Sequence, residues 1–170
     1  MTGRKHNPLI TVANIFIFFV VIIFQISGAV DISIKTATPI LLLPLLTAYA
    51  VFNPLTYCAI AGLVAGACLD SIANGAYCFN TIALFLLSVA VSLAANNLFN
   101  KNIRAATALS FITSGLYYLL LWLFFYAWNM PEGDSMRFLL SYALPSAVYT
   151  AIFIFPFYFI FKAFEKRKTY

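Results

Sequence analysis

The sequence predicts an all-α integral membrane protein, a six-transmembrane-helix bundle formed by a single membrane domain over residues 1–170. Composition is the first reason: 64% of the residues are hydrophobic and 9% are charged, whereas charged residues make up about a quarter of a soluble domain. The second reason is the length of the apolar runs, since a bilayer core about 30 Å thick needs about 20 apolar residues per helix. The predicted spans are residues 9–27, 39–52, 55–73, 77–96, 103–128 and 138–161, and residues 162–170 form a basic cytoplasmic tail.

The first three spans are defined by local breaks in the apolar sequence. Residues 9–27 exceed the usual apolar core of a secretory signal, so we interpret them as a retained helix. Pro39 suits the first turn of the second span, because a proline there loses no helical hydrogen bond. Asn53-Pro54 is a turn signal, and it divides an apolar run that is too long for one helix.

The last three spans are separated by polar segments. Residues 74–75, Asn-Gly, end the third span, and the polar residues 97–102 end the fourth. Residues 129–135 contain Pro, Glu, Gly and Asp, which predicts an aqueous loop before the sixth span. That span contains Pro145 and Pro156, which should bend it.

Basic residues predict the orientation, with both termini inside. The formal charge is +5, and an even number of spans places the two termini on the same side of the membrane. With the termini inside, only Lys35 and Arg137 lie outside, which agrees with the positive-inside rule. No basic stripe of the density expected for a phosphate backbone is present, so nucleic acid is not a predicted partner. The basic residues on the cytoplasmic side are Arg4, Lys5, Lys101, Arg104, Lys162, Lys166, Arg167 and Lys168.

One carboxylate, Asp70, stands in an otherwise uncharged run between Lys35 and Lys101. A charge at membrane depth costs at least a few kcal/mol, so it is rarely there by accident. Gly62, Gly66 and Asp70 follow at spacings of four and therefore share one helix face. Such a face of small residues has two interpretations, packing against a neighbouring helix of the same chain or docking of a partner's helix.

Asp70 itself also has alternative roles. It could cap the turn at Asn74-Gly75 by accepting backbone N–H bonds, which would be purely structural. It could instead pair with Lys35 or Arg137, which lie on the same predicted side of the membrane.

Other polar residues in the spans are interpreted as contacts within the bundle. Asn14 and Gln25 are isolated amides that should turn toward the other helices. Hydroxyl residues form stripes on the fourth and fifth spans, where they can bond across helices or to their own backbone. These stripes consist of Thr81, Ser88, Ser92 and Asn96, and of Ser110, Ser114 and Tyr118.

Nothing in the sequence predicts catalysis, a cofactor or a metal site. We find no His cluster, no nucleophile with a base at a plausible spacing and no glycine loop for phosphate. Cys58, Cys68 and Cys78 form no CxxC pair, and we interpret them as small membrane residues. The sequence therefore favours a non-enzymatic protein.

Residues 62–91 resemble the MreD family, the small membrane protein of the bacterial cell-elongation machinery. The family pattern has a glycine, a second glycine four residues on, an aspartate four further and a glycine in the following turn. Chain length, number of spans and the basic C-terminal tail agree with the family. The matching residues are Gly62, Gly66, Asp70 and Gly75, with Asn80 in the polar element Phe79-Asn80-Thr81 that opens the next helix.

The resemblance implies a multi-pass scaffold of the bacterial cytoplasmic (inner) membrane, needed for rod shape. Such proteins bind MreC, which has one span, and through it connect to MreB and to peptidoglycan synthesis by RodA and a class B penicillin-binding protein. Their bundle is thought to resemble the S components of energy-coupling transporters. We expect the face of Gly62 and Gly66, with Asp70 near its outer end, to receive the MreC-like partner.

The alternative is that the chain is itself a substrate-binding S component of a vitamin transporter. That class docks its energising partner through small residues on the first helix, typically Ala-xxx-Ala. The first span here is bulky throughout, and the bundle has few polar groups to bind a vitamin. A channel or a small exporter is a third possibility.

Overall fold

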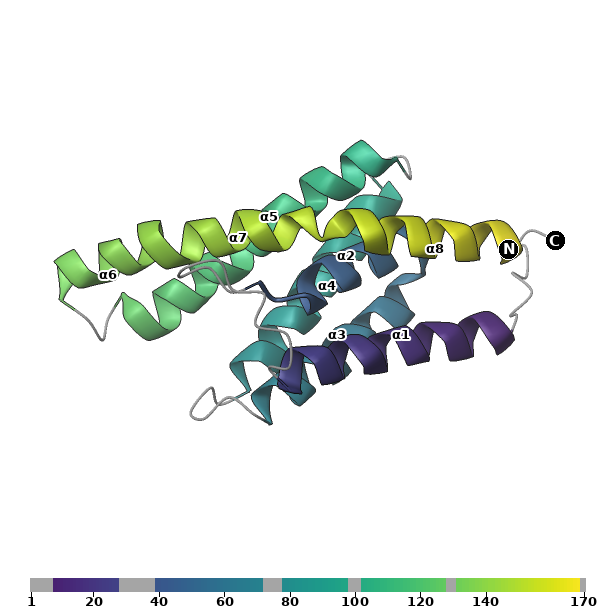
Figure 1. Cartoon of the computed structure of the whole chain (residues 1–170), viewed down its shortest axis with the longest axis horizontal. Coiled ribbons are helices and arrows are strands. Elements are labelled where there is room, and N and C mark those ends of the chain that lie inside the picture. The colour runs from purple at the N-terminus through teal and green to yellow at the C-terminus, as the bar shows by residue number, and fades with distance from the viewer. Residues whose placement is uncertain (1–7, 28–38, 72–77, 98–101, 128–130, 169–170) are drawn as a thin grey trace.

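The computed structural model describes residues 8–27, 39–71, 78–97, 102–127 and 131–168, which are almost entirely helical (Figure 1). No strand occurs among these residues. The elements are α1 (Pro8–Ser27), α2 (Leu42–Phe52), α3 (Leu55–Asp70), α4 (Phe79–Asn97), α5 (Ile103–Leu121), η1 (Trp122–Tyr126), α6 (Glu132–Phe138), η2 (Leu139–Ala143), α7 (Leu144–Ile152) and α8 (Ile154–Lys168), where η marks a π-helical turn.

Four helical segments in the described part are long and apolar enough to cross a membrane. The all-helical class is therefore confirmed, and the long apolar helices are those of a membrane-embedded protein, whereas six crossings and their direction stay a prediction. The helices α2 and α3 are also apolar, but their 11 and 16 residues span only about 17 and 24 Å. The four long segments are Leu9–Ser27, Phe79–Asn96, Ile103–Tyr126 and Asp134–Lys166.

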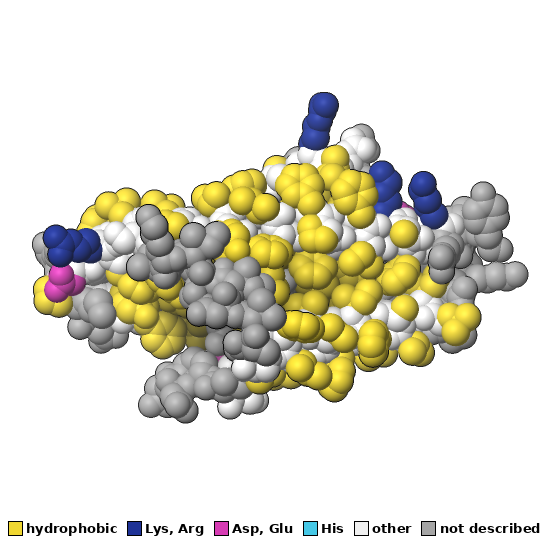
Figure 2. Space-filling model, in the orientation of Figure 1, with side chains coloured by type: hydrophobic (Ala, Val, Ile, Leu, Met, Phe, Trp, Pro, Cys, Tyr) yellow, Lys and Arg dark blue, Asp and Glu magenta, His cyan; other side chains and the backbone are white. Residues whose placement is uncertain are grey.

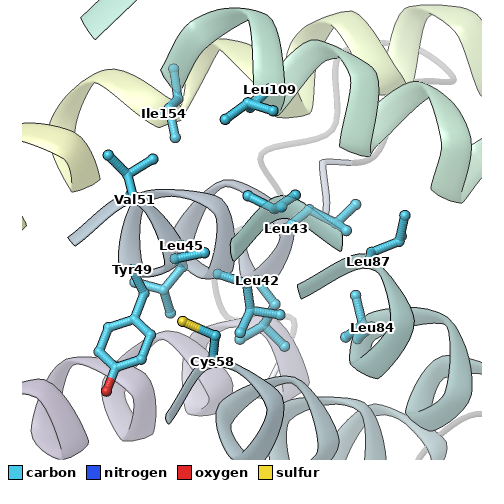
Figure 3. Close-up of a cluster of buried hydrophobic side chains, with 14 of the residues drawn as sticks. Leu42, Leu43, Leu45, Tyr49, Val51, Cys58, Leu84, Leu87, Leu109 and Ile154 are labelled. Carbon is cyan, nitrogen blue, oxygen red and sulfur yellow. The ribbon is translucent and has the colours of Figure 1, made fainter. Parts of the chain in front are cut away.

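The short helix α2 forms the centre of the bundle. All of its residues are buried, and it contacts α1, α3, α4, α5, α7 and α8. In Figure 3 its leucines lie among side chains from α4, α5 and α8. Because α2 is surrounded by other helices, it needs no polar face, which explains its largely apolar sequence. Its buried Thr47 hydroxyl donates to the Leu43 carbonyl at 2.9 Å. The labelled side chains around it include Leu84, Leu87, Leu109 and Ile154.

The start of α2 corrects one prediction. The helix begins at Leu42, so Pro39 lies before it and not in its first turn. Pro44 occupies the first turn instead. A helix that began at Pro39 would place Pro44 in its interior, where the ring would clash with the carbonyl of residue 40.

The last membrane segment is longer than predicted. Helix α6 begins at Glu132, inside the predicted loop 129–135, and α8 continues to Lys168, so most of the predicted tail is helical. Its lysines and arginine are good helix formers, which is why the helix continues beyond the apolar run.

Both prolines of this segment accompany irregular backbone. The π-helical turn η2 ends two residues before Pro145, and the helix breaks at Phe153, three residues before Pro156. A proline lacks the N–H for the helical bond and clashes with the carbonyl four residues earlier. Nevertheless α6, α7 and α8 keep one common direction in Figure 1.

Among the described residues, charged side chains lie only near the starts or ends of the helical segments, as expected for a protein with an apolar belt. Hydrophobic side chains cover much of the face in Figure 2, where dark-blue and magenta side chains meet at the α6 end and further dark-blue side chains project from the opposite half. Helix α1 begins and α8 ends at the same end of the bundle (Figure 1).

Candidate functional site

The glycine face of α3 is filled by α4. A Cβ added to Gly62 would overlap the Ser88 hydroxyl and would lie 2.7 Å from the Leu84 carbonyl oxygen. A Cβ added to Gly66 would overlap Thr81 and would lie 2.6 Å from the Asn80 carbonyl oxygen. These neighbours are largely backbone, so they cannot rotate away. Both glycines are therefore needed for the close approach of the two helices, which form the most extensive helix pair in the described part.

Asp70, the last residue of α3, caps the N-terminus of α4. Its Oδ1 accepts a hydrogen bond from the backbone N–H of Asn80 at 3.0 Å, and its Oδ2 accepts from the backbone N–H of Thr81 at 2.7 Å. The Thr81 hydroxyl also donates to Oδ2. The first N–H groups of a helix have no partner within the helix and carry partial positive charge, so a carboxylate there is favourable.

The local sequence explains why this cap comes from another helix. Cys78 precedes α4 with φ of 62°, in the left-handed region, and its side chain is not one of the usual oxygen caps. Asp70 supplies the acceptor from the neighbouring helix end. The predicted alternative, a cap on Asn74-Gly75, falls on residues outside those described, as does a pair with Lys35.

Asn80 extends this junction to α5. While its backbone N–H binds Asp70, its buried side-chain oxygen accepts a hydrogen bond from the Tyr117 hydroxyl. Three helices thus meet in one chain of contacts from α3 through α4 to α5. We call the residues Gly62, Gly66, Asp70, Asn80, Thr81 and Tyr117 the α3–α4 junction.

Aromatic rings pack beside the junction. Phe79, the first residue of α4, has its ring centroid 6.1 Å from that of Tyr117, 5.8 Å from that of Phe124 and 5.1 Å from that of Phe125. The Tyr117 ring packs in turn against that of Tyr118 at 5.5 Å. This cluster joins the start of α4 to the end of α5 and to η1.

The junction decides between the two interpretations of the glycine face. Gly62 and Gly66 pack against α4, and Asp70 has hydrogen-bond partners on both oxygens. The expected docking of a partner's helix on this face is therefore wrong, because the chain itself occupies it. Internal packing, the other interpretation, agrees with the geometry. Gly75, the last glycine of the predicted motif, lies outside the described residues.

A second polar junction, which the sequence indicated only in part, surrounds the start of α2. Gln25 accepts a hydrogen bond from the Leu41 N–H at 2.8 Å, and its amide nitrogen donates to the Pro39 carbonyl at 3.5 Å. The Ile40 N–H donates to the Thr150 hydroxyl at 3.2 Å. Gln25 was expected to face the bundle, but nothing in the local sequence pointed to Thr150.

Most residues of the hydroxyl stripes lie inside the bundle, whereas Thr81 is half-buried and Asn96 is exposed. Ser88, Ser92, Ser110 and Ser114 are buried. The Ser88 hydroxyl donates to the Phe85 carbonyl at 2.9 Å, and the Asn96 amide donates to Ser92 at 3.3 Å. The buried hydroxyl oxygens of Ser110 and Ser114 have no hydrogen-bond partner among the residues that the structure describes.

The described residues contain no candidate metal centre. No three His, Cys, Asp or Glu side chains come together there as possible metal ligands. Cys58 is buried, Cys68 is half-buried and Cys78 is exposed, all three as free thiols. Comparisons with protein-family models, with curated proteins and with solved structures find no match to this chain.

Proposed function

We propose that this chain is a non-enzymatic scaffold of the bacterial cytoplasmic membrane, similar to MreD, that helps to maintain rod shape. It crosses the membrane six times with both termini inside. It binds an MreC-like single-span partner and through it links MreB to peptidoglycan synthesis by RodA and a class B penicillin-binding protein.

One observation carries the proposal. Of the residues that resemble the MreD pattern, Gly66, Asp70 and Asn80 meet in one contact network, and Gly62 packs against the same helix, α4. In this chain the pattern holds α3 and α4 in close contact and caps the N-terminus of α4. A closely packed and capped helix pair suits a protein that positions others.

The placement of charge supports the proposed orientation. The described basic residues Arg104, Lys162 and Lys166 belong to the start of α5 and the end of α8, whereas Arg137 belongs to α6 at the opposite end. This asymmetry agrees with the positive-inside rule if the termini are cytoplasmic.

Genetic depletion and purification test the function. Rod-shaped cells that lose this chain should become round, and the full chain should restore their shape. The tagged full chain should also co-purify the MreC-like protein from the same membranes. Cells that keep their rod shape, or a chain purified without that protein, would overturn the proposal.

Labelling of single cysteines tests the orientation. In a cysteine-free background, Asp134→Cys should react with a membrane-impermeant maleimide in intact spheroplasts. Lys166→Cys should react only after the membrane is opened. The reverse pattern, or labelling of both sites from outside, would contradict the proposed topology.

The unpartnered hydroxyls of Ser110 and Ser114 favour a second candidate, the S component of a vitamin transporter. A buried polar atom without a partner costs stability unless a ligand meets it. A vitamin that raises the melting temperature of the wild type, but not of Ser110→Ala, would support this candidate. Equal melting temperatures with and without each vitamin would exclude it for those vitamins.

A further inference from the structure

Exposed cations gather where α5 begins and α8 ends. Arg104 is the second residue of α5, and Lys162 and Lys166 lie in the last turns of α8, one helical turn apart. All three side chains are exposed. Figure 2 shows dark-blue side chains over this part of the molecule.

Along the exposed face of α8, the side chains change from apolar to basic toward the C-terminal end. Phe155 is 43% exposed and Phe159 is 57% exposed, and Lys162 and Lys166 follow on the same side of the helix. The Lys162 ammonium lies 5.6 Å from the centre of the Tyr158 ring. Phenylalanines that can contact acyl chains are followed along the helix by lysines. This order matches the change from hydrocarbon to headgroup at a membrane surface.

The opposite end of the bundle lacks this excess of positive charge among its described residues. Asp134 and Arg137 are both exposed and lie three residues apart on α6, so their opposite charges compensate each other locally. At the other end, the cations Arg104, Lys162 and Lys166 outnumber the one described carboxylate, Glu165, so an anion is attracted to this end, where α5 begins and α8 ends.

We propose that this end binds the headgroup of an anionic phospholipid. Lys162 and Lys166 contact the phosphate, Arg104 adds to the positive field, and Phe155 and Phe159 pack against the acyl chains. The apolar half of the face favours a lipid over a soluble anion, because free phosphate would leave the two phenylalanines without a function in binding. This proposal is independent of the scaffold function.

Lipid titration of the purified full chain tests the proposal. Native mass spectrometry in detergent should show tighter binding of phosphatidylglycerol than of phosphatidylcholine. The double variant Lys162→Gln/Lys166→Gln should lose this preference, by roughly fivefold in affinity for each lysine removed. High salt should weaken the binding of phosphatidylglycerol to the wild type, since exposed charges are screened.

Arg137→Gln is the matched control, because it removes one exposed cation from the other end. It should change the affinity for phosphatidylglycerol by less than twofold. Equal binding of the two lipids to the wild type would overturn the proposal, as would an equal loss in Arg137→Gln. Inorganic phosphate that competes fully at millimolar concentration would also overturn it and would identify a soluble anion as the ligand. Circular dichroism of each variant verifies that its helices are intact.

Discussion

Thr81 binds Asp70 twice, through its backbone N–H at 2.7 Å and through its hydroxyl. The two residues are eleven positions apart and belong to different helices. A side chain at the end of α3 therefore fixes where α4 begins. With Gly66 packed against the backbone of Thr81, the contact leaves little freedom for the two helices to slide past each other.

Asp70→Ala should destabilise the protein by about 1–3 kcal/mol, because it leaves two N–H groups at the start of α4 without their acceptor. Asp70→Asn should cost less, since its single carbonyl oxygen still accepts one of these bonds. Reversible unfolding in mixed micelles, followed by circular dichroism, measures both free energies. If Asp70→Ala unfolds like the wild type, the cap does not contribute to stability.

Gly66→Ala and Gly115→Ala form a matched pair of substitutions within helices. At Gly66 the new methyl group would meet the backbone of Asn80 and Thr81, so α3 and α4 must separate, at a cost of about 1–3 kcal/mol or more. At Gly115 nothing lies within 4 Å of the new carbon, so the better helix propensity of alanine should leave stability unchanged or raised by up to about 1 kcal/mol.

The same unfolding measurement compares the two glycine variants. A Gly66→Ala protein as stable as Gly115→Ala would mean that the helices are less tightly packed than described. Gly62→Ala should fall between them, because the Ser88 side chain can move although the Leu84 carbonyl cannot.

Tyr117→Phe tests the link from the junction to α5. The substitution removes the hydrogen bond to Asn80 and keeps the ring that packs on Phe79, so the loss should be about 1 kcal/mol or less. Combined with Asp70→Ala, its effect should be non-additive, because both contacts act through Asn80. Strict additivity in a double-mutant cycle would show that the two bonds are independent.

The sequence predicted which α3 residues form the α3–α4 junction, but it did not decide which helix they contact. Spacings of four placed Gly62, Gly66 and Asp70 on one face, which is a property of any α-helix. The spacing does not say which helix fills that face, because a partner and a neighbour in the same chain both require small residues. The positions of Asn80 and Thr81 opposite it depend on how the chain returns after Asp70, which periodicity does not encode.

The start of α2 shows a different limit of sequence analysis. The prediction placed Pro39 in the first helical turn, but Pro44 occupies that turn and residues 39–41 precede the helix. The backbone of these preceding residues has tertiary hydrogen-bond partners that the sequence did not indicate. Those partners are Gln25, in α1, and Thr150, which is 110 residues from the Ile40 that it binds. The spacing of nearby residues cannot indicate a contact between residues so far apart in the sequence.

Gln25→Leu should therefore destabilise the protein although it makes the first span more apolar. The variant removes the acceptor for the part-buried Leu41 N–H, and an unmet backbone donor there costs about 1–3 kcal/mol. Ile23→Leu on the same helix is the control, because Ile23 is exposed and the exchange keeps an apolar side chain of equal size. Unfolding in micelles should separate the two variants, and hydrogen exchange at Leu41 should be faster only in Gln25→Leu. If Gln25→Leu is as stable as the control, the amide does not hold the start of α2, and the buried backbone before Leu42 must be satisfied by other groups.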